Sequence, residues 1–185
     1  MIPDSDKRNP SDLSIGIHAA GGIIRNIGIE GFYTGIFVPN SNMTIHQVSC
    51  ARCHYGVILG TDIKVFDYTA WDTDVALRIN GSLCSATGIR GDSIGSHLVE
   101  IGGGGRHTLT DLDSDFGLGS LVHIVNNASV SNLAVHGVHG RIGAIDAVRT
   151  HKSAIKTARD TEPCRSSVLS LGKTANLDGA IINTN

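Results

Sequence analysis

The amino-acid sequence predicts an all-β protein, a right-handed parallel β-helix (a solenoid) of about six or seven coils. Three observations lead to this prediction. The 185-residue chain combines 23 Gly and 41% hydrophobic residues with 4% aromatic residues and 4 Pro, which is typical of β-rich proteins with tight turns. Turn signals recur at intervals of roughly 20 to 24 residues. A short strand with alternating apolar residues precedes each turn.

Five copies of this strand-and-turn unit can be read along the chain. The predicted strands are 35–38, 56–59, 76–79, 98–101 and 121–124, and the turns that follow them are 39–42, 60–62, 80–82, 102–105 and 126–129. The turns are rich in Gly, Asn, Asp and Ser, which are the residue types that turns favour. The segment 130–135 is predicted to form the last regular coil.

The apolar residues of successive copies fall into columns. The first two copies align without a gap at a spacing of 21 residues, and the third copy is about one residue shorter. The aligned pairs of the first two copies include Ile24/Ile45, Ile27/Val48, Ile29/Cys50, Phe32/Cys53, Ile36/Val57 and Val38/Leu59. One coil cannot bury its own apolar face, so these columns indicate stacked coils that share an interior. The spacing of a leucine-rich repeat is not maintained, and a β-sandwich would not explain columns in register.

The extent of the repeat divides the chain into three parts. Residues 1–12 form a polar lead-in, residues 13–140 the β-helix, and residues 141–185 a less regular C-terminal segment with final coils or a cap. Within the last part, the basic residues of 145–160 recur at helical spacing, which predicts a short helix or a long loop.

Composition also limits the expected partners. A formal net charge of −2 gives no reason to expect nucleic acid or an anionic membrane surface as a partner. The chain has no run of about 18 apolar residues that would span a membrane, and its first residues do not resemble a secretory signal. Four irregularly spaced cysteines indicate reduced thiols in a protein made in the cytosol.

One short motif suggests a haem protein. Cys50-Ala51-Arg52-Cys53-His54 matches the C-x-x-C-H pattern of c-type haem attachment. In the repeat, however, Cys50 takes the place of Ile29 and Cys53 that of Phe32, which are inward positions. We therefore expect buried, reduced thiols, with no haem and no other cofactor.

The segment 24–60, with its Ile-x-Asn-x-x-Ile start and its Gly-Ile corner, resembles the coils of the pectate-lyase-like parallel β-helix superfamily. The resemblance covers roughly residues 13–138, and the Gly-rich later part is similar in style to bacteriophage tailspikes. The tailspike resemblance implies a homotrimer that binds, and often cleaves, bacterial surface polysaccharide. It also implies a location in the virion tail after synthesis in the host cytoplasm.

A first candidate site follows from the stacking of three strands. If Leu77 aligns with the corresponding residues of the next two copies, then Arg78, Glu100 and His123 form one outward column. Glu100 would be a candidate catalytic carboxylate, with Arg78 and His123 as substrate-binding residues, since glycan cleavage usually requires carboxylates. The alternative is a charge ladder between paired strands.

A second candidate site surrounds the only tryptophan. Trp71 lies beside Asp72 and Asp74, and the repeat is expected to place Tyr33 and His54 in matching positions of neighbouring copies. An exposed Trp or Tyr can stack on a sugar ring, and nearby aspartates could act in catalysis. The alternative is a Trp in the core or between subunits, with two aspartates in a loop.

Three aspartates at alternate positions form a weak candidate for a calcium site. Asp111, Asp113 and Asp115 resemble the start of a D-x-D-x-D-G loop, but Gly117 comes one position late and Val122 replaces the bidentate Glu. A solvated acidic loop is the favoured interpretation, so no metal is expected.

The preferred functional hypothesis is a tailspike or fibre segment that recognises host-surface polysaccharide. The first alternative is a free-standing polysaccharide lyase or glycoside hydrolase. The second is a structural spacer or trimerisation unit of a virion.

Overall fold

The computed structural model describes residues 13–115, 117, 119–139, 169–171, 176–177 and 180–183. These ranges contain strands and no helix, so the predicted all-β class is confirmed. The polar lead-in at 1–12 and the predicted helix or loop at 145–160 lie outside the described residues. A search of the described part of the chain for a helix long and apolar enough to cross a membrane finds none.

The strands form two parallel sheets. Sheet A contains seven strands in the order β1-β3-β5-β7-β9-β11-β13, and sheet B contains eight, with β14-β12-β10-β8-β6-β4-β2 in sequence and β15 also paired to β12. The strands are β1 (Ile15–His18), β2 (Gly22–Glu30), β3 (Thr34–Val38), β4 (Met43–Ala51), β5 (Tyr55–Leu59), β6 (Ile63–Trp71), β7 (Val75–Ile79), β8 (Cys84–Asp92), β9 (Val99–Ile101), β10 (Gly105–Asp115), β11 (Val122–Ile124), β12 (Ser129–His139), β13 (Leu169–Leu171), β14 (Asn176–Leu177) and β15 (Ala180–Asn183).

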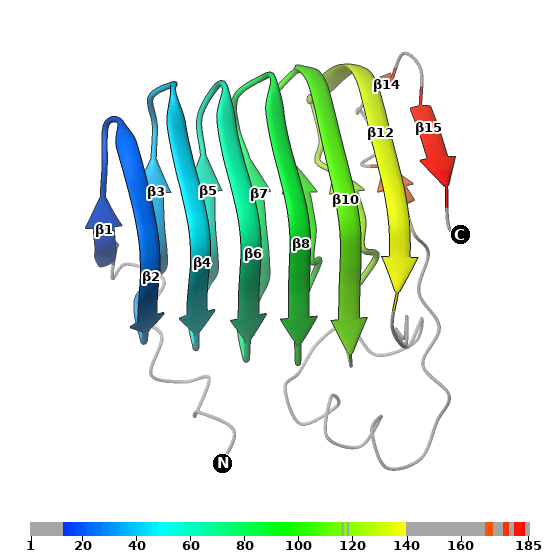
Figure 1. Ribbon diagram of the computed structural model, residues 1–185. Coiled ribbons are helices and arrows are strands. Elements are labelled where there is room, and N and C mark those ends of the chain that lie inside the picture. Colours follow the sequence, from blue (N-terminus) through cyan, green and yellow to red (C-terminus); the bar gives the residue numbers. More distant parts are fainter. Residues whose placement is uncertain are drawn as a thin grey trace, which may run out of the picture.

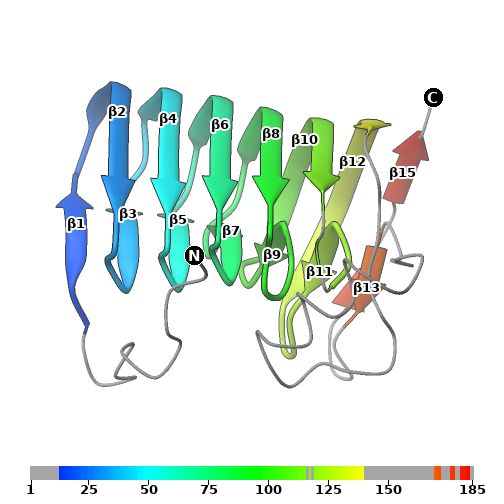
Figure 2. The same cartoon turned by 90° about the horizontal axis from the view of Figure 1, so that it is seen from below.

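Each coil contributes one strand to each sheet. In Figure 1 the chain rises through sheet A at the back, crosses to the front and descends through sheet B while it advances along the axis, which is right-handed winding. Figure 2 shows the same succession of rungs from below. The seven strands of sheet A agree approximately with the predicted six or seven coils, and the structure confirms a parallel β-solenoid.

The predicted columns are present in the register. Ile24 pairs with Ile45, and Ile29 with Cys50, in the alignment between β2 and β4. The shorter third copy places Leu77 beside Val57, as expected. These inward residues form one continuous apolar core that extends from Ile29 to Val135. Burial of apolar area, at about 25 cal/mol per Å², is therefore shared between neighbouring coils.

Three lines of left-handed residues bend the chain, two of them in six successive coils and the third in four. All of them have φ between 50° and 101°. The first line lies at or just before the start of the sheet B strands and contains Gly22, Asn42, Asp62, Leu83, Gly105 and Asn127. The second lies inside these strands and contains Asn26, Gln47, Asp67, Gly88, Asp111 and Gly137. The third directly follows them and contains Gly31, Arg52, Asp72 and Ser93.

The second line of left-handed residues bends each sheet B strand at the same place, so that sheet B is divided into two halves. Arg25 pairs with His46 and Ile27 with Val48, so the residues at the bend, Asn26 and Gln47, are left out of the pairing. Gly, Asn and Asp predominate in the first two lines and make up half of the third, because they adopt the left-handed conformation at least cost. Each coil is consequently three-sided, with sheet A on one side and the two halves of sheet B on the others.

The cysteines of the C-x-x-C-H motif belong to the core. Cys50 and Cys53 are buried, as expected from the repeat, Cys84 is buried as well, and Cys164 lies outside the described residues. The Cys50 thiol donates to the carbonyl of Gly56 at 3.4 Å. Burial raises the pKa of the Cys50 thiol to about 12, so the thiol stays protonated at neutral pH.

His107 is an exception in this apolar interior. It lies on β10 between Cys84 and Leu133 of the flanking strands, and it is 2% exposed. Neither ring nitrogen makes a hydrogen bond of good geometry, and a weak contact with the backbone of Gly104 only partly opposes the effect of burial on the pKa of His107. Burial lowers the pKa of His107 because the imidazolium would lose its hydration. The folded protein therefore holds this side chain neutral.

We predict that His107→Leu increases the free energy of unfolding and weakens its dependence on pH. Below a pH of about 6.5 the unfolded chain binds a proton at His107 and the folded chain does not, so the stability of the unmodified protein decreases as pH falls. Above that pH both states are neutral and His107 adds no pH dependence. Removing a buried polar group that lacks a well-formed hydrogen bond contributes about 1–3 kcal/mol. Urea denaturation at pH 7.5 and 5.5 measures both effects, and an unchanged difference between the two pH values would contradict them.

The corner geometry generates a second prediction. Leu83 is a left-handed residue with φ 58° and a half-exposed side chain, so its strain is not offset by burial. Leu83→Asn should raise the free energy of unfolding by about 1 kcal/mol, because Asn tolerates the left-handed conformation better. Ile23→Asn, at an exposed strand position without positive φ, is the matched control and should give no gain. Equal effects of the two substitutions in thermal unfolding would refute the role assigned to the corner.

Candidate functional site

Sheet A presents one continuous column of outward side chains. The register places one residue of each strand from β1 to β11 in this column, namely His18, Phe37, Ile58, Arg78, Glu100 and His123. The predicted neighbours Arg78, Glu100 and His123 are therefore adjacent, as the stacking of the copies indicated. The column begins with aromatic and apolar residues and continues with charged and polar ones.

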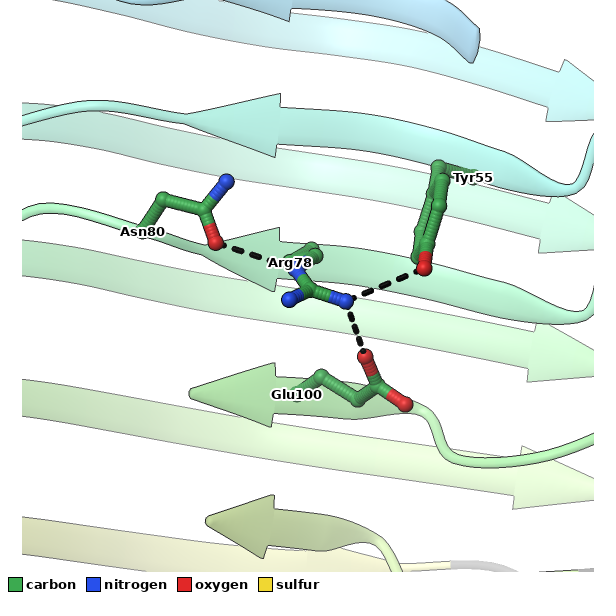
Figure 3. A network of polar contacts seen from close by, with 4 residues as sticks. All are labelled: Tyr55, Arg78, Asn80 and Glu100. Atoms are coloured by element: carbon green, nitrogen blue, oxygen red, sulfur yellow. Dashed lines mark hydrogen bonds and ion pairs between the residues drawn. The ribbon is translucent and has the colours of Figure 1, made fainter. Parts of the chain in front are cut away.

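Arg78 is the centre of a polar network on this column. Its Nη1 donates to Glu100 Oε2 and to the Tyr55 hydroxyl, both at 3.0 Å, and its Nε donates to Asn80 Oδ1 at 2.9 Å. Figure 3 shows the guanidinium group between the Tyr55 ring and the Glu100 carboxylate. The side chains of Arg78 and Glu100 are 26% and 13% exposed, so this pair is less solvated than an ordinary surface ion pair.

Tyr55 connects this network to the residues that directly precede the sheet A strands, namely Tyr33, His54 and Asp74. The Arg78 guanidinium lies 5.3 Å from the centroid of the Tyr55 ring, within the range of a cation–π interaction. Burial raises the pKa of Tyr55, with Arg78 opposing that effect, so the phenol keeps its proton at neutral pH. Tyr55 can therefore both donate and accept a hydrogen bond.

His54 and Asp74, which directly precede β5 and β7, form a pair. His54 Nδ1 lies 2.7 Å from Asp74 Oδ2, and the two side chains are about one-third exposed. The His54 ring stacks on Tyr33 at a centroid distance of 4.7 Å and meets the Tyr55 ring edge-on at 4.4 Å. Two aromatic rings and a carboxylate thus hold the imidazole in one orientation.

A further pair of histidines lies toward the later coils. The rings of His97 and His123 stack at a centroid distance of 4.3 Å. The Ser120 backbone N–H donates to His97 Nδ1 at 3.1 Å, which leaves the other ring nitrogen as the protonated one in the neutral form. The His97–His123 pair extends the polar part of the column beyond Glu100.

These residues make one surface, which we call the sheet A face. It consists of His18, Tyr33, Phe37, His54, Tyr55, Asp74, Arg78, His97, Glu100 and His123. Aromatic residues are scarce in this chain, with four Phe, three Tyr and one Trp. Even so, Tyr33, Phe37 and Tyr55 gather here, and the His18 ring packs against Phe37 at 5.2 Å. Such a surface offers flat rings beside convergent hydrogen-bonding groups.

The second predicted site is divided between two surfaces. Trp71 ends β6 in sheet B, where it pairs with Ala51 and Asp92 and is 41% exposed. The expectation that Tyr33 and His54 match Trp71 is therefore wrong. Asp74, not Trp71, is the residue that continues their line.

Asp72 has a backbone role that the sequence did not reveal. It is a left-handed residue of the third corner, in line with Arg52 and Ser93. Its N–H donates to the carbonyl of Asp92 in the next coil at 3.1 Å. The structure places Asp74 on the sheet A face, whereas Asp72 helps to turn the chain toward it.

The three aspartates of the calcium motif lie on β10. Asp111 is the left-handed residue at the bend, Asp113 pairs with Arg90, and Asp115 pairs with Asp92. No group of three or more His, Cys, Asp or Glu side chains that could hold a metal ion occurs in the part of the chain that the structure describes. The bend at Asp111 thus interrupts the regular alternation of the three aspartates that suggested a calcium loop.

Two residues of the face, His54 as the partner of Asp74 and Tyr55 as the partner of Arg78, were not identified from the sequence. The contact between His54 and Asp74 could have been predicted from the length of the repeat. A copy of 21 residues would place Val75 beside His54, and the shortening by one residue places Asp74 there instead. Tyr55 gave no such signal, since its contact depends on the length and direction of the Arg78 side chain.

Comparison with known proteins finds no matching family model, no matching curated protein and no matching solved structure. Of the predicted resemblance, the structure therefore shows the parallel β-solenoid fold alone.

Proposed function

We propose that this chain is a segment of a phage tailspike or tail fibre that recognises bacterial surface polysaccharide through the sheet A face. One observation carries the proposal. In a chain with few aromatic residues, three of them gather on one side of the solenoid, next to the Arg78–Glu100 network. Aromatic rings and convergent polar groups are the two elements from which sugar-binding sites are built.

The two parts of the face would contact different parts of a saccharide. Tyr33 and Phe37 would pack against the apolar side of a sugar ring, while Arg78, Asn80 and Glu100 would exchange hydrogen bonds with its hydroxyl groups. Neighbouring coils are about 4.8 Å apart, so a saccharide chain that lies along the axis would meet successive strands. Backbone pairing holds these strands in place, which limits the ordering cost of binding.

The assembly and location are parts of the same proposal. A homotrimer in the virion tail would present the sheet A face three times, and simultaneous contact with a repetitive glycan would increase avidity. The parallel solenoid supports this proposal because it is a stiff scaffold with its strands joined along the whole axis.

Substitutions on the two sheets test the proposal. Binding to an array of bacterial capsular and lipopolysaccharide glycans is measured for the unmodified protein and for Tyr55→Ala, Arg78→Met and Phe66→Ala. Phe66 is a matched control because it is an aromatic residue on sheet B with 37% exposure. Each change on the sheet A face should weaken binding at least about tenfold, or about 1.4 kcal/mol, and Phe66→Ala should not.

The remaining outcomes separate the alternatives. Equal losses for Tyr55→Ala and Phe66→Ala would contradict the assignment of the face. Absence of binding to any glycan by an intact trimer would favour a structural spacer. Release of reducing sugar by a monomer would favour a free-standing lyase or hydrolase, and would require that Asp74 or Glu100 leaves its present partner. The molar mass in solution distinguishes trimer from monomer.

A further inference from the structure

His54 and Asp74 provide the sheet A face with an oriented acid–base group. An ionised carboxylate can only accept hydrogen bonds, so the 2.7 Å contact requires that His54 Nδ1 carries the proton and donates it to Asp74. The neutral imidazole then has its lone pair on Nε2, on the other side of the ring. A histidine held in this way by a carboxylate is the arrangement that serves as a general base in many hydrolases.

The groups around this pair favour ester hydrolysis over cleavage of a glycosidic bond. Glycosidic cleavage needs a carboxylic acid and a second, free carboxylate. Here Asp74 is engaged by His54, and Glu100 by Arg78. Ester hydrolysis instead needs a base that activates water and donors that stabilise an oxyanion.

Such donors surround Tyr55. The Tyr55 ring contacts both His54 and the Arg78 guanidinium, so it lies between the base and the cation. The Tyr55 hydroxyl is one donor, and the Nη2 group of Arg78 is a second, since the contacts to Tyr55, Asn80 and Glu100 use Nη1 and Nε. Aromatic rings beside the pair would hold the sugar that bears the ester.

We propose that the sheet A face hydrolyses O-acyl esters, such as O-acetyl groups, on the saccharide it binds. The inference rests on the proposed glycan binding and adds a substrate class to it. His54 is the catalytic base, and Asp74 is a positioning residue that fixes the tautomer of His54.

The reaction needs water as its only co-reactant. The water oxygen forms a bond to the ester carbonyl carbon as His54 Nε2 takes one water proton, and the carbonyl oxygen becomes an oxyanion near Tyr55 and Arg78. The tetrahedral species then breaks its bond to the sugar oxygen, which receives the proton from Nε2. The products are a free sugar hydroxyl and a carboxylic acid.

The chain contains a matched control pair. His46 Nε2 lies 3.3 Å from Asp67 Oδ2 on sheet B, so the residue types are the same and the distance is comparable. The aromatic neighbour of His46 is Phe66, which has no hydroxyl to stabilise an oxyanion. His46→Gln therefore removes an imidazole of the same kind without affecting the proposed reaction.

The test measures acetate release by the full chain. The substrates are 4-nitrophenyl acetate and an O-acetylated bacterial capsular polysaccharide that the protein binds, with the chemically deacetylated polysaccharide as a binding reference. His54→Gln should lower the rate about 100-fold or more, and His46→Gln should leave it unchanged. Asp74→Asn should lower kcat about tenfold and leave KM unchanged, because the imidazole loses the acceptor that fixes its tautomer. Asp74→Glu, which keeps a carboxylate acceptor, should restore part of kcat, whereas a purely structural role of Asp74 would change KM and the thermal stability together with kcat.

The outcomes for the two proposals are distinct. Binding of both polysaccharides without acetate release would overturn the esterase inference and leave the binding proposal intact. Acetate release that His54→Gln and His46→Gln reduce equally would also overturn it. Binding of neither polysaccharide would contradict the proposed function itself.

Discussion

The left-handed corner residues are the constraint on which the rest of the structure depends. A solenoid coil closes only if the chain turns at the same places in each copy, and a left-handed residue gives a sharp turn at each place. The three corner lines recur through the described coils with φ between 50° and 101°. Gly, Asn and Asp supply most of these positions, and Leu83 and Arg52 show that other residues are accepted where stacking holds the backbone. Because the corners coincide from coil to coil, the segments between them pair in register.

Register then decides which side chains meet. Along the second half of β7 the side chains alternate, so Leu77 and Ile79 are buried in the core and Arg78 points out beside Glu100. The shared core stabilises all coils together, and the outward side chains are left for other uses. The sheet A face is thus a consequence of stacking. Contacts such as Tyr33 with His54 and Arg78 with Glu100 join residues more than 20 positions apart in sequence and cross from one coil to the next.

Much of this arrangement could be predicted, and the limits have physical reasons. Apolar periodicity reports burial, so the columns of Ile29 with Cys50 and of Val57 with Leu77 were evident, as was the row of Arg78, Glu100 and His123. The bend inside the sheet B strands was not evident, because Gln47 or Asp67 gives no apolar signal. Trp71 was placed in the wrong line for a related reason. Corner contacts depend on the exact length of one coil, and a single residue more or less changes the partner of His54 from Val75 to Asp74.

A disulfide cross-link between neighbouring coils tests most directly whether stacking in this register builds the face. In the structure Ile58 of β5 pairs with Arg78 of β7, and neighbouring strands are about 4.8 Å apart, within the Cα separation that a disulfide spans. The account predicts that Ile58→Cys combined with Arg78→Cys forms an intramolecular disulfide on mild oxidation, detected by peptide mapping. Ile58→Cys combined with Asn80→Cys, two residues further along, should remain reduced. Cross-linking of the second pair in preference to the first would show that the register, and with it the candidate site, is wrong.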